Sequence, residues 1–297
     1  MAFTLCGRAR RLVSATSVHK NGFLQRLQQT GSDRFQQLGE AKAIRLIPRR
    51  TNMVQELGIR EELMQENKEN RENRELETRY DFLGEMRQRF LRFKRQKYLP
   101  EIDKFQALAI AQSPKVMVIG CADSRVCPSY VLGFQPGEAF TIRNVANLVT
   151  PIQNGSTETN SALEFAVTTL QVENIIVMGH SNCGGIAALM SHENHQEHHS
   201  SLVERWVMNG KAAKLRTQAD LSHLSFDEQC RNCEKESIKD SVMNLITYPW
   251  IRERVKRGEV KIHGCYYNLS DCSLEKWRLS SDKNNNGFYL SDREIWS

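Results

Sequence analysis

The sequence predicts an α/β fold in which a mostly parallel central sheet is flanked by helices and preceded by an N-terminal helical arm. Two short apolar runs, Val116–Ile119 and Ile175–Met178, are each closed by a glycine. Unbroken β-branched runs of this kind are typical of strands buried on both faces of a parallel sheet. Between them, residues 159–170 repeat apolar residues at helical spacing. Strands alternating with helices favour parallel pairing through right-handed crossovers.

The other elements are predicted in the same way. Residues 54–110 are expected to be helical, and from Phe82 to Phe93 apolar residues recur every three or four positions. That face is expected to lie either on the chain's own core or on a second copy. Residues 61–79 are almost all charged or amide residues, which favours a solvated helix or a linker. Further strands are predicted at 139–145 and 260–267, the latter after a helical stretch at 234–257.

The N-terminal segment is typical of an organelle transit peptide. Residues 1–54 hold ten lysines or arginines and two acidic residues, a net charge of +8. We expect a mitochondrial address, with the chloroplast stroma as the alternative; a basic tail that binds anionic surfaces is the competing interpretation. The predicted organisation is therefore a transit segment (1–54), a helical arm (55–110) and an α/β domain (111–297).

Composition excludes several classes of protein. Residues 55–297 carry a net charge of −2, so nothing there indicates a nucleic-acid partner. No apolar run approaches the ~18 residues of a membrane-spanning helix. Eight cysteines in 297 residues are too few for a small disulfide scaffold. Metal binding or catalysis is therefore the first role to consider for them.

Two polar motifs follow two of the predicted strands. Cys121-Ala-Asp123-Ser-Arg125 comes after the first, and His180-Ser-Asn-Cys183 comes after the other. Because the carboxyl ends of parallel strands meet at one edge of a sheet, both motifs are expected to face the same space. Two thiols and an imidazole suit zinc, and three protein ligands leave the open position of a catalytic site. Buried structural cysteines are the alternative, which the pairing of both motifs with buried strands disfavours.

The segments CADSR, PSYVLGFQPGEAFTIRNVANLV and GHSNCGG resemble the plant-type β-class carbonic anhydrases, and CEKES, TYPW and HGCYYN extend the likeness to the C-terminal region. The resemblance implies one Zn²⁺ per chain, held by Cys121, His180 and Cys183. It also implies reversible hydration of carbon dioxide to bicarbonate and a proton, through attack of zinc-bound hydroxide. Asp123 would accept a hydrogen bond from that hydroxide, and Arg125 would keep Asp123 ionised.

The resemblance also implies a substrate pocket and an oligomer. The Gln112 amide would bind a substrate oxygen, and the N–H of Gly184 would approach a bound anion. Phe140, Val145 and Phe165 would form the apolar wall, although core packing is equally compatible with them. Two residues depart from the family pattern: the position of Phe165 is often Tyr, and that of Asn182 is often a small residue. Family members are dimers or multiples of dimers in which both chains line the cleft.

Rival functions and secondary motifs remain open at this level. Another zinc hydrolase acting on a small electrophile such as carbonyl sulfide is one alternative. A non-enzymatic zinc- or bicarbonate-binding subunit is the other, disfavoured by the intact Gln112, Asp123 and Arg125. Cys230 and Cys233 are expected to be reduced structural thiols; a redox pair, or a second zinc site with Cys265 and Cys272, is the alternative. The histidines of residues 192–199 are expected in a solvated loop.

Overall fold

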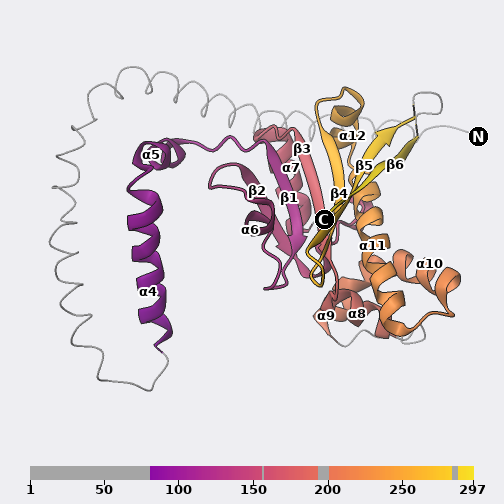
Figure 1. Ribbon diagram of the computed structural model, residues 1–297. Coiled ribbons are helices and arrows are strands. Elements are labelled where there is room, and N and C mark those ends of the chain that lie inside the picture. The colour runs from indigo at the N-terminus through magenta and orange to yellow at the C-terminus, as the bar shows by residue number, and fades with distance from the viewer. Residues whose placement is uncertain (1–80, 156, 193–200, 283–286) are drawn as a thin grey trace, which may run out of the picture. The chain divides into compact units, whose positions relative to one another are not determined.

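A six-stranded sheet forms the centre of unit Glu101–Ser297 in the computed structural model, which describes residues 81–155, 157–192, 201–282 and 287–297 (Figure 1). The strand order is β2-β1-β3-β4-β5-β6, with the first three pairings parallel and the last two antiparallel. This confirms the predicted, mostly parallel α/β fold. The strands are β1 (Val116–Cys121), β2 (Ala139–Asn144), β3 (Asn174–His180), β4 (Lys261–Asn268), β5 (Ser273–Ser281) and β6 (Phe288–Trp296).

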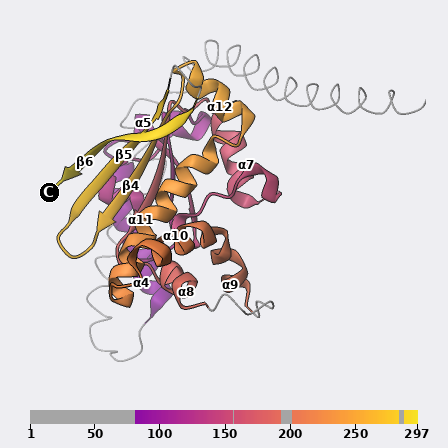
Figure 2. The ribbon, with the colours of Figure 1, turned by 90° about the vertical axis from the view of Figure 1, so that its right-hand side faces the viewer.

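Helices connect the parallel strands β1, β2, β3 and β4 along the chain. Figure 2 shows α11 running along the sheet. Helix α12 lies beyond one end of α11, and α10 packs beside the part of α11 near its other end. The helical elements of this unit are α5 (Ile102–Ile110), α6 (Pro128–Leu132), η3 (Val145–Asn147), η4 (Ile152–Asn154), α7 (Glu158–Glu164), η5 (Phe165–Thr169), α8 (Gly184–Ser191), α9 (Leu202–Val207), η6 (Met208–Gly210), α10 (Lys211–Leu221), α11 (Phe226–Leu245) and α12 (Pro249–Lys256).

Alternation along the strands divides the core between the two faces of the sheet. Met117 and Ile119 on β1 belong to the larger cluster, which includes side chains from α7, η5, α11 and α12. Val118, between them, belongs to a separate cluster on the opposite face with Val126 and Met178. Burial on both faces explains why the sequences of β1 and β3 contain continuous apolar runs.

Helix α11 approaches the sheet closely where β3 ends. A Cβ added at Gly179 would lie 2.6 Å from Ile238 Cδ1, a separation that real side chains do not tolerate. Glycine at this position therefore allows α11 to sit against β3, one residue before His180. The same contact brings the middle of α11, including Glu234, beside the strand end where the second motif begins.

Two predicted helices differ in detail from those observed. The stretch expected at 234–257 is not one helix, because α11 ends at Leu245 and α12 begins at Pro249. Pro249 is responsible: Tyr248 before it has φ −82° and ψ 113°, the extended conformation that proline imposes on its predecessor. The helix predicted at 159–170 is formed by α7 and by η5, a π-helical segment.

The described part of unit Met1–Pro100 is helical, as predicted. It contains α4 (Phe82–Phe93) and the π-helical η2 (Lys94–Tyr98), and the Asp81 side chain caps α4 by accepting a hydrogen bond from Gly84 N–H. Leu83 and Phe90 on α4 are exposed. The predicted transit segment and the arm before residue 81 lie outside the described residues. None of the helices in the described ranges has the length and apolar character needed to cross a membrane.

Candidate metal centre

The two motifs meet at the carboxyl edge of the sheet, as expected from the pairing of their strands. Parallel β1 and β3 are direct neighbours, in register Gly120↔Met178. Cys121 is the last residue of β1 and His180 the last of β3. After His180 the chain turns through Asn182, at φ 56°, and α8 begins directly after Cys183. The strand pairing thus brings together donors that are 62 residues apart in the sequence.

Three buried donors form a group that fits a metal ion. One ligand atom each from Cys121, His180 and Cys183 lies within 4.8 Å of the others, and the two Sγ atoms are 3.9 Å apart. All three side chains are less than 5% exposed. The His180 Nδ1–H donates to Ser181 O at 2.9 Å, which leaves Nε2 buried with no hydrogen-bond partner among the described residues. An orphaned imidazole nitrogen facing two thiols matches the tetrahedral N/S donor set that zinc prefers.

The electrostatics of the two thiols also fits a cation. The hydrogen bond with Cys183 lowers the pKa of Cys121, and the same contact is the main cause that raises the pKa of Cys183. In the protein alone, only one of two adjacent buried sulfurs therefore readily carries a negative charge. A divalent cation between them removes this conflict, because thiolates bound to a metal are deprotonated.

Asp123 lies beside this group and is held as an anion. Its Oδ1 accepts hydrogen bonds from Arg125 N–H at 2.9 Å and Nε–H at 3.0 Å, and its Oδ2 accepts one from Nη2 at 2.7 Å. These side-chain hydrogen bonds are the main reason that the pKa of Asp123 is lowered below the ordinary carboxyl range. The ion pair therefore forms at neutral pH and is lost only as the pH falls far below that range. Asp123 Oδ2 is 3.9 Å from His180 Nε2, so the carboxylate faces the donor group.

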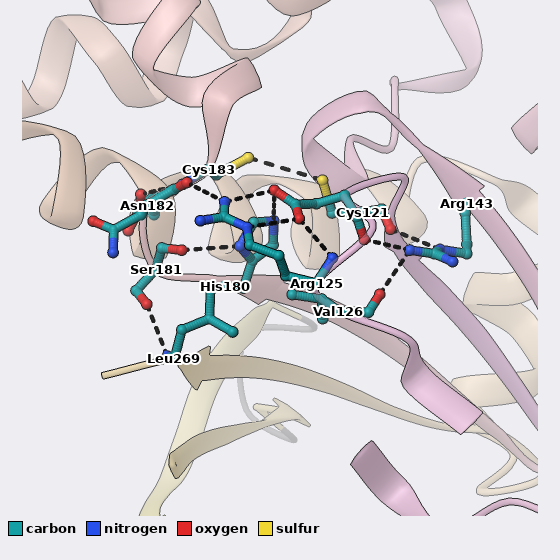
Figure 3. A network of polar contacts seen from close by, with 11 residues as sticks. Cys121, Arg125, Val126, Arg143, His180, Ser181, Asn182, Cys183 and Leu269 are labelled. Carbon is teal, nitrogen blue, oxygen red and sulfur yellow. Dashed lines mark hydrogen bonds and ion pairs between the residues drawn. The ribbon is translucent and has the colours of Figure 1, made fainter. Parts of the chain in front are cut away.

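Arg125 joins the two loops of the site (Figure 3). Besides holding Asp123, its Nη2 donates to Asn182 O at 2.9 Å. The loop after β1 is in this way tied to the turn after β3. The structure thus places Asp123 and Arg125 as a pair next to the donors.

Two of the five predicted pocket residues lie near the donors. Gly184 follows Cys183 directly, and open space surrounds the position where its Cβ would be. Val145 Cγ1 is 2.8 Å from the ideal Cβ position of the next residue, Gly185, and the Val145 side chain is 36% exposed. An apolar side chain and an open glycine are therefore next to the second cysteine.

The other three pocket residues lie at the opposite end of the strands within this chain. Phe140 pairs with Met117 near the start of β1, whereas Asn144 pairs with Cys121. Four residues of strand correspond to about 13 Å. Phe165 packs near Phe140, with 5.8 Å between ring centroids, and Gln112 precedes β1. One chain does not bring these side chains to its own metal donors.

Two supporting residues escaped the sequence analysis. Glu234 on α11 is 3% exposed; its Oε1 accepts the Cys183 N–H at 2.9 Å, and its Oε2 accepts the Tyr266 hydroxyl at 2.8 Å. Ser181 Oγ accepts the Leu269 N–H at 2.9 Å, which ties the second motif to the end of β4. Glu234 could have been found as a lone acid on the helical stripe of Cys230, Cys233 and Ile238.

The remaining cysteines do not form a second metal group in the described ranges, where the group found is that of Cys121, His180 and Cys183. Cys230 and Cys233 are buried free thiols, and burial raises their pKa values to about 11 and about 12. These raised pKa values favour the prediction that Cys230 and Cys233 are reduced structural thiols. Most of the histidine cluster at 192–199 lies outside the described residues.

Comparison with known proteins identifies relatives over the whole length. The family model described as "Carbonic anhydrase" matches residues 116–274. The chain is 88% identical over 297 residues, all of both chains, to a protein of Arabidopsis thaliana named "Beta carbonic anhydrase 6, mitochondrial". That name, at this identity, confirms the predicted mitochondrial location.

Solved structures of similar fold agree with the sequence comparison. A structure of the β-carbonic anhydrase CcaA, 28% identical, matches with a TM-score of 0.62 over 71% of this chain and 92% of that chain. One of two tetrameric β-carbonic anhydrases of Sordaria macrospora, 26% identical, matches with a TM-score of 0.59 over 65% of this chain and 95% of that chain.

The donor geometry predicts that removing one thiol releases the metal. We expect the Cys183→Ala protein to purify with strongly reduced zinc, because two remaining protein ligands hold the ion weakly. Elemental analysis of zinc per chain is the measurement. Cys265→Ala is the matched control, since Cys265 is also buried but lies outside the donor group. Full zinc in the Cys183→Ala protein would show that the ion is held elsewhere.

Proposed function

Because this chain belongs to the plant-type β-class carbonic anhydrases, we propose that its catalysis of CO₂ hydration depends on zinc and proceeds by attack of hydroxide on CO₂. The chain is a carbonic anhydrase, a lyase that interconverts carbon dioxide and water with bicarbonate and a proton. The observation that carries the zinc proposal is the buried group of Cys121, His180 and Cys183, in which the His180 Nε2 has no hydrogen-bond partner among the described residues.

One zinc ion per chain would be held by these three residues. Zinc, when bound, lowers the pKa of a water molecule so that it serves as the hydroxide nucleophile. Two thiolates and a neutral imidazole cancel the charge of the ion, so the water should ionise less readily than at a three-histidine site. A well-oriented hydrogen-bond acceptor beside this water therefore matters more than it would at a three-histidine site.

Asp123 is that acceptor in the proposed mechanism. Its carboxylate would accept a hydrogen bond from the attacking hydroxyl, without taking its proton, and so direct an oxygen lone pair toward CO₂. Only the anion can do this, and the Arg125 contacts keep it ionised. Arg125 would also keep the Asp123 carboxylate from moving onto a bound metal ion, since its guanidinium is tied to Asn182 O.

Gly184 and Val145 would line the substrate side of the cleft. CO₂ is apolar and needs a dry surface, whereas bicarbonate needs hydrogen-bond donors. Val145 supplies apolar surface, and the open space around Gly184 lets an anion approach the backbone N–H. Together, the Asp123 carboxylate, the three metal ligands and this surface would give the site its preference for CO₂ and bicarbonate.

We further propose that Gln112, Phe140 and Phe165 complete the cleft of a second chain in a dimer or a multiple of dimers. Their distance from the metal donors of their own chain supports this arrangement, as does the exposure of Phe165 at 42%. A two-fold dimer would present each chain's amide and phenylalanines to its partner's zinc site. The exposed apolar residues of α4 supply further surface for such contacts.

The domain assignment is also a proposal. Residues 1–54 would direct import into mitochondria and be removed, 55–110 would form the arm, and 111–297 the zinc-binding catalytic domain. The basic composition of the first segment supports the address.

Asp123 and Arg125 have distinguishable roles that mutation can test. We expect Asp123→Asn and Arg125→Ala to keep zinc near the wild-type level, because neither residue belongs to the donor group. We expect kcat for CO₂ hydration to fall ~10²-fold or more in both, the scale of a lost positioning or acid–base group. In cobalt-substituted Arg125→Ala, absorption spectroscopy should detect a carboxylate ligand.

Asp220→Asn is the matched control, and it should retain wild-type turnover because Asp220 is an exposed residue near the C-terminal end of α10 and belongs to neither motif. Near-normal turnover in Asp123→Asn would contradict the proposed role of the carboxylate. A wild-type protein that carries zinc but hydrates no CO₂ would contradict the function itself.

The shared cleft predicts complementation between two defective chains. Asp123→Asn and Gln112→Ala chains carrying different tags are co-expressed, and the mixed dimers are isolated through both tags. If Gln112 acts across the interface, one site of each mixed dimer has every group intact, and activity returns to about half the wild-type value. Activity equal to the mean of the two parent proteins would instead show that Gln112 serves its own chain.

A further inference from the structure

Arg143 is a charged residue of the site to which the proposed zinc mechanism gives no role. It lies on β2, paired with Gly120 in the parallel register of β1 and β2. Its guanidinium donates three hydrogen bonds, and Figure 3 shows them converging on the loop that follows β1. Nε–H donates to Cys121 O at 2.8 Å, and Nη2 donates to Asp123 O at 2.6 Å and to Val126 O at 2.7 Å.

The acceptors of Arg143 are unusual for a cation. All three are backbone carbonyls of residues 121–126, which are the last residue of β1 and the loop after it, here called the Cys121–Val126 loop. No ion pair joins Arg143 to a carboxylate in the described part of the chain. Arg125, on the same loop, instead forms an ion pair with the carboxylate of Asp123. One arginine thus holds the functional side chain, while the other holds the backbone that carries it.

Holding these carbonyls fixes the direction of two functional side chains. The Cys121 carbonyl sets the peptide plane between residues 121 and 122, and the Asp123 carbonyl sets the plane after Asp123. Ala122 N–H donates to Asn144 O at 2.8 Å, which secures the first plane from its other side. With both planes held, the Cα–Cβ bonds of Cys121 and Asp123 point in defined directions.

Arginine suits this role better than lysine. Three carbonyl dipoles directed at one point repel one another unless a cation lies between them. A planar guanidinium presents several N–H donors at fixed angles, whereas an ammonium is a compact charge on a flexible stem. Lysine at position 143 would therefore keep the charge but not the simultaneous contacts.

We propose that Arg143 is a positioning residue for CO₂ hydration, which acts by holding the Cys121–Val126 loop so that Cys121 and Asp123 keep their orientation toward the metal. This inference rests on the proposed zinc mechanism, because the benefit of the fixed loop is realised through the metal ligand and the hydroxyl acceptor. Arg143 itself contacts neither substrate nor metal in this role.

The test compares Arg143→Met and Arg143→Lys with wild-type holoenzyme. Zinc per chain, kcat and KM are measured for each, together with the visible absorption bands of the cobalt-substituted proteins. We expect near-wild-type zinc, KM within about twofold, and kcat lowered ~10- to 100-fold in Arg143→Met, the range reported for residues that support metal ligands. Arg143→Lys should lie between Arg143→Met and the wild type. The cobalt bands should shift in both variants, because the Cys121 thiolate no longer has its native orientation.

Arg257→Met is the matched control. Arg257 is exposed and pairs with Glu259 before β4, at the end of the sheet opposite the donors. The Arg257→Met protein should have the wild-type kcat and, when substituted with cobalt, the wild-type absorption bands. A general effect of losing one positive charge would appear in both methionine variants, whereas loop positioning affects only that of Arg143.

Three results would overturn the assignment. The first is wild-type kcat and cobalt bands in Arg143→Met. The second is an Arg143→Met protein whose activity falls in proportion to its zinc content, so that turnover per bound zinc stays normal. Near-ultraviolet circular dichroism shows whether Arg143→Met folds. If it does not fold, Arg143→Lys is the deciding variant, and the third result is a wild-type kcat with wild-type cobalt bands in that protein. An inactive zinc-loaded wild-type enzyme would instead refute the proposed function.

Discussion

The parallel pairing of β1 with β3 determines where the chemistry of this protein occurs. Both strands are buried on their two faces, and each ends in a metal donor at the same edge of the sheet. The ladder brings the ends of the two strands together, so that Cys121 lies near His180, and one turn later α8 starts with Cys183 at its amino end. Apolar burial along the strands therefore stabilises a polar arrangement that would be costly to assemble from flexible loops.

Each loop of the site is held from outside the metal donors. The first is bound by Arg143 from β2, and the second by Glu234 from α11 and by Leu269 after β4. The approach of α11 depends on Gly179, because Ile238 occupies the space where a side chain would lie. Packing distant from the ion thus controls the ligand positions, as expected when outer groups orient metal ligands.

The sequence predicted the parts of the site that follow directly from local pattern. Apolar runs closed by glycine identified β1 and β3, and the motifs after them identified the donors and the Asp123–Arg125 pair. Contacts that depend on packing were not predictable in the same way. Glu234 reaches Cys183 across 51 residues and Arg143 reaches Cys121 across 22. The helical stripe marks Glu234 as a buried acid, but no local pattern indicates which residue either side chain contacts. The break before Pro249, in contrast, follows from a local rule, because proline restricts Tyr248 to extended backbone.

The most direct measurement of the central claim is X-ray absorption at the zinc edge of the purified enzyme. If the ends of β1 and β3 form one metal site, the fine structure should contain two sulfur neighbours at about 2.3 Å and one histidine nitrogen at about 2.0–2.1 Å. The Cys121→Ser protein should lose one sulfur neighbour and keep the nitrogen. A shell of nitrogen and oxygen without sulfur, or one unchanged in Cys121→Ser, would contradict the account.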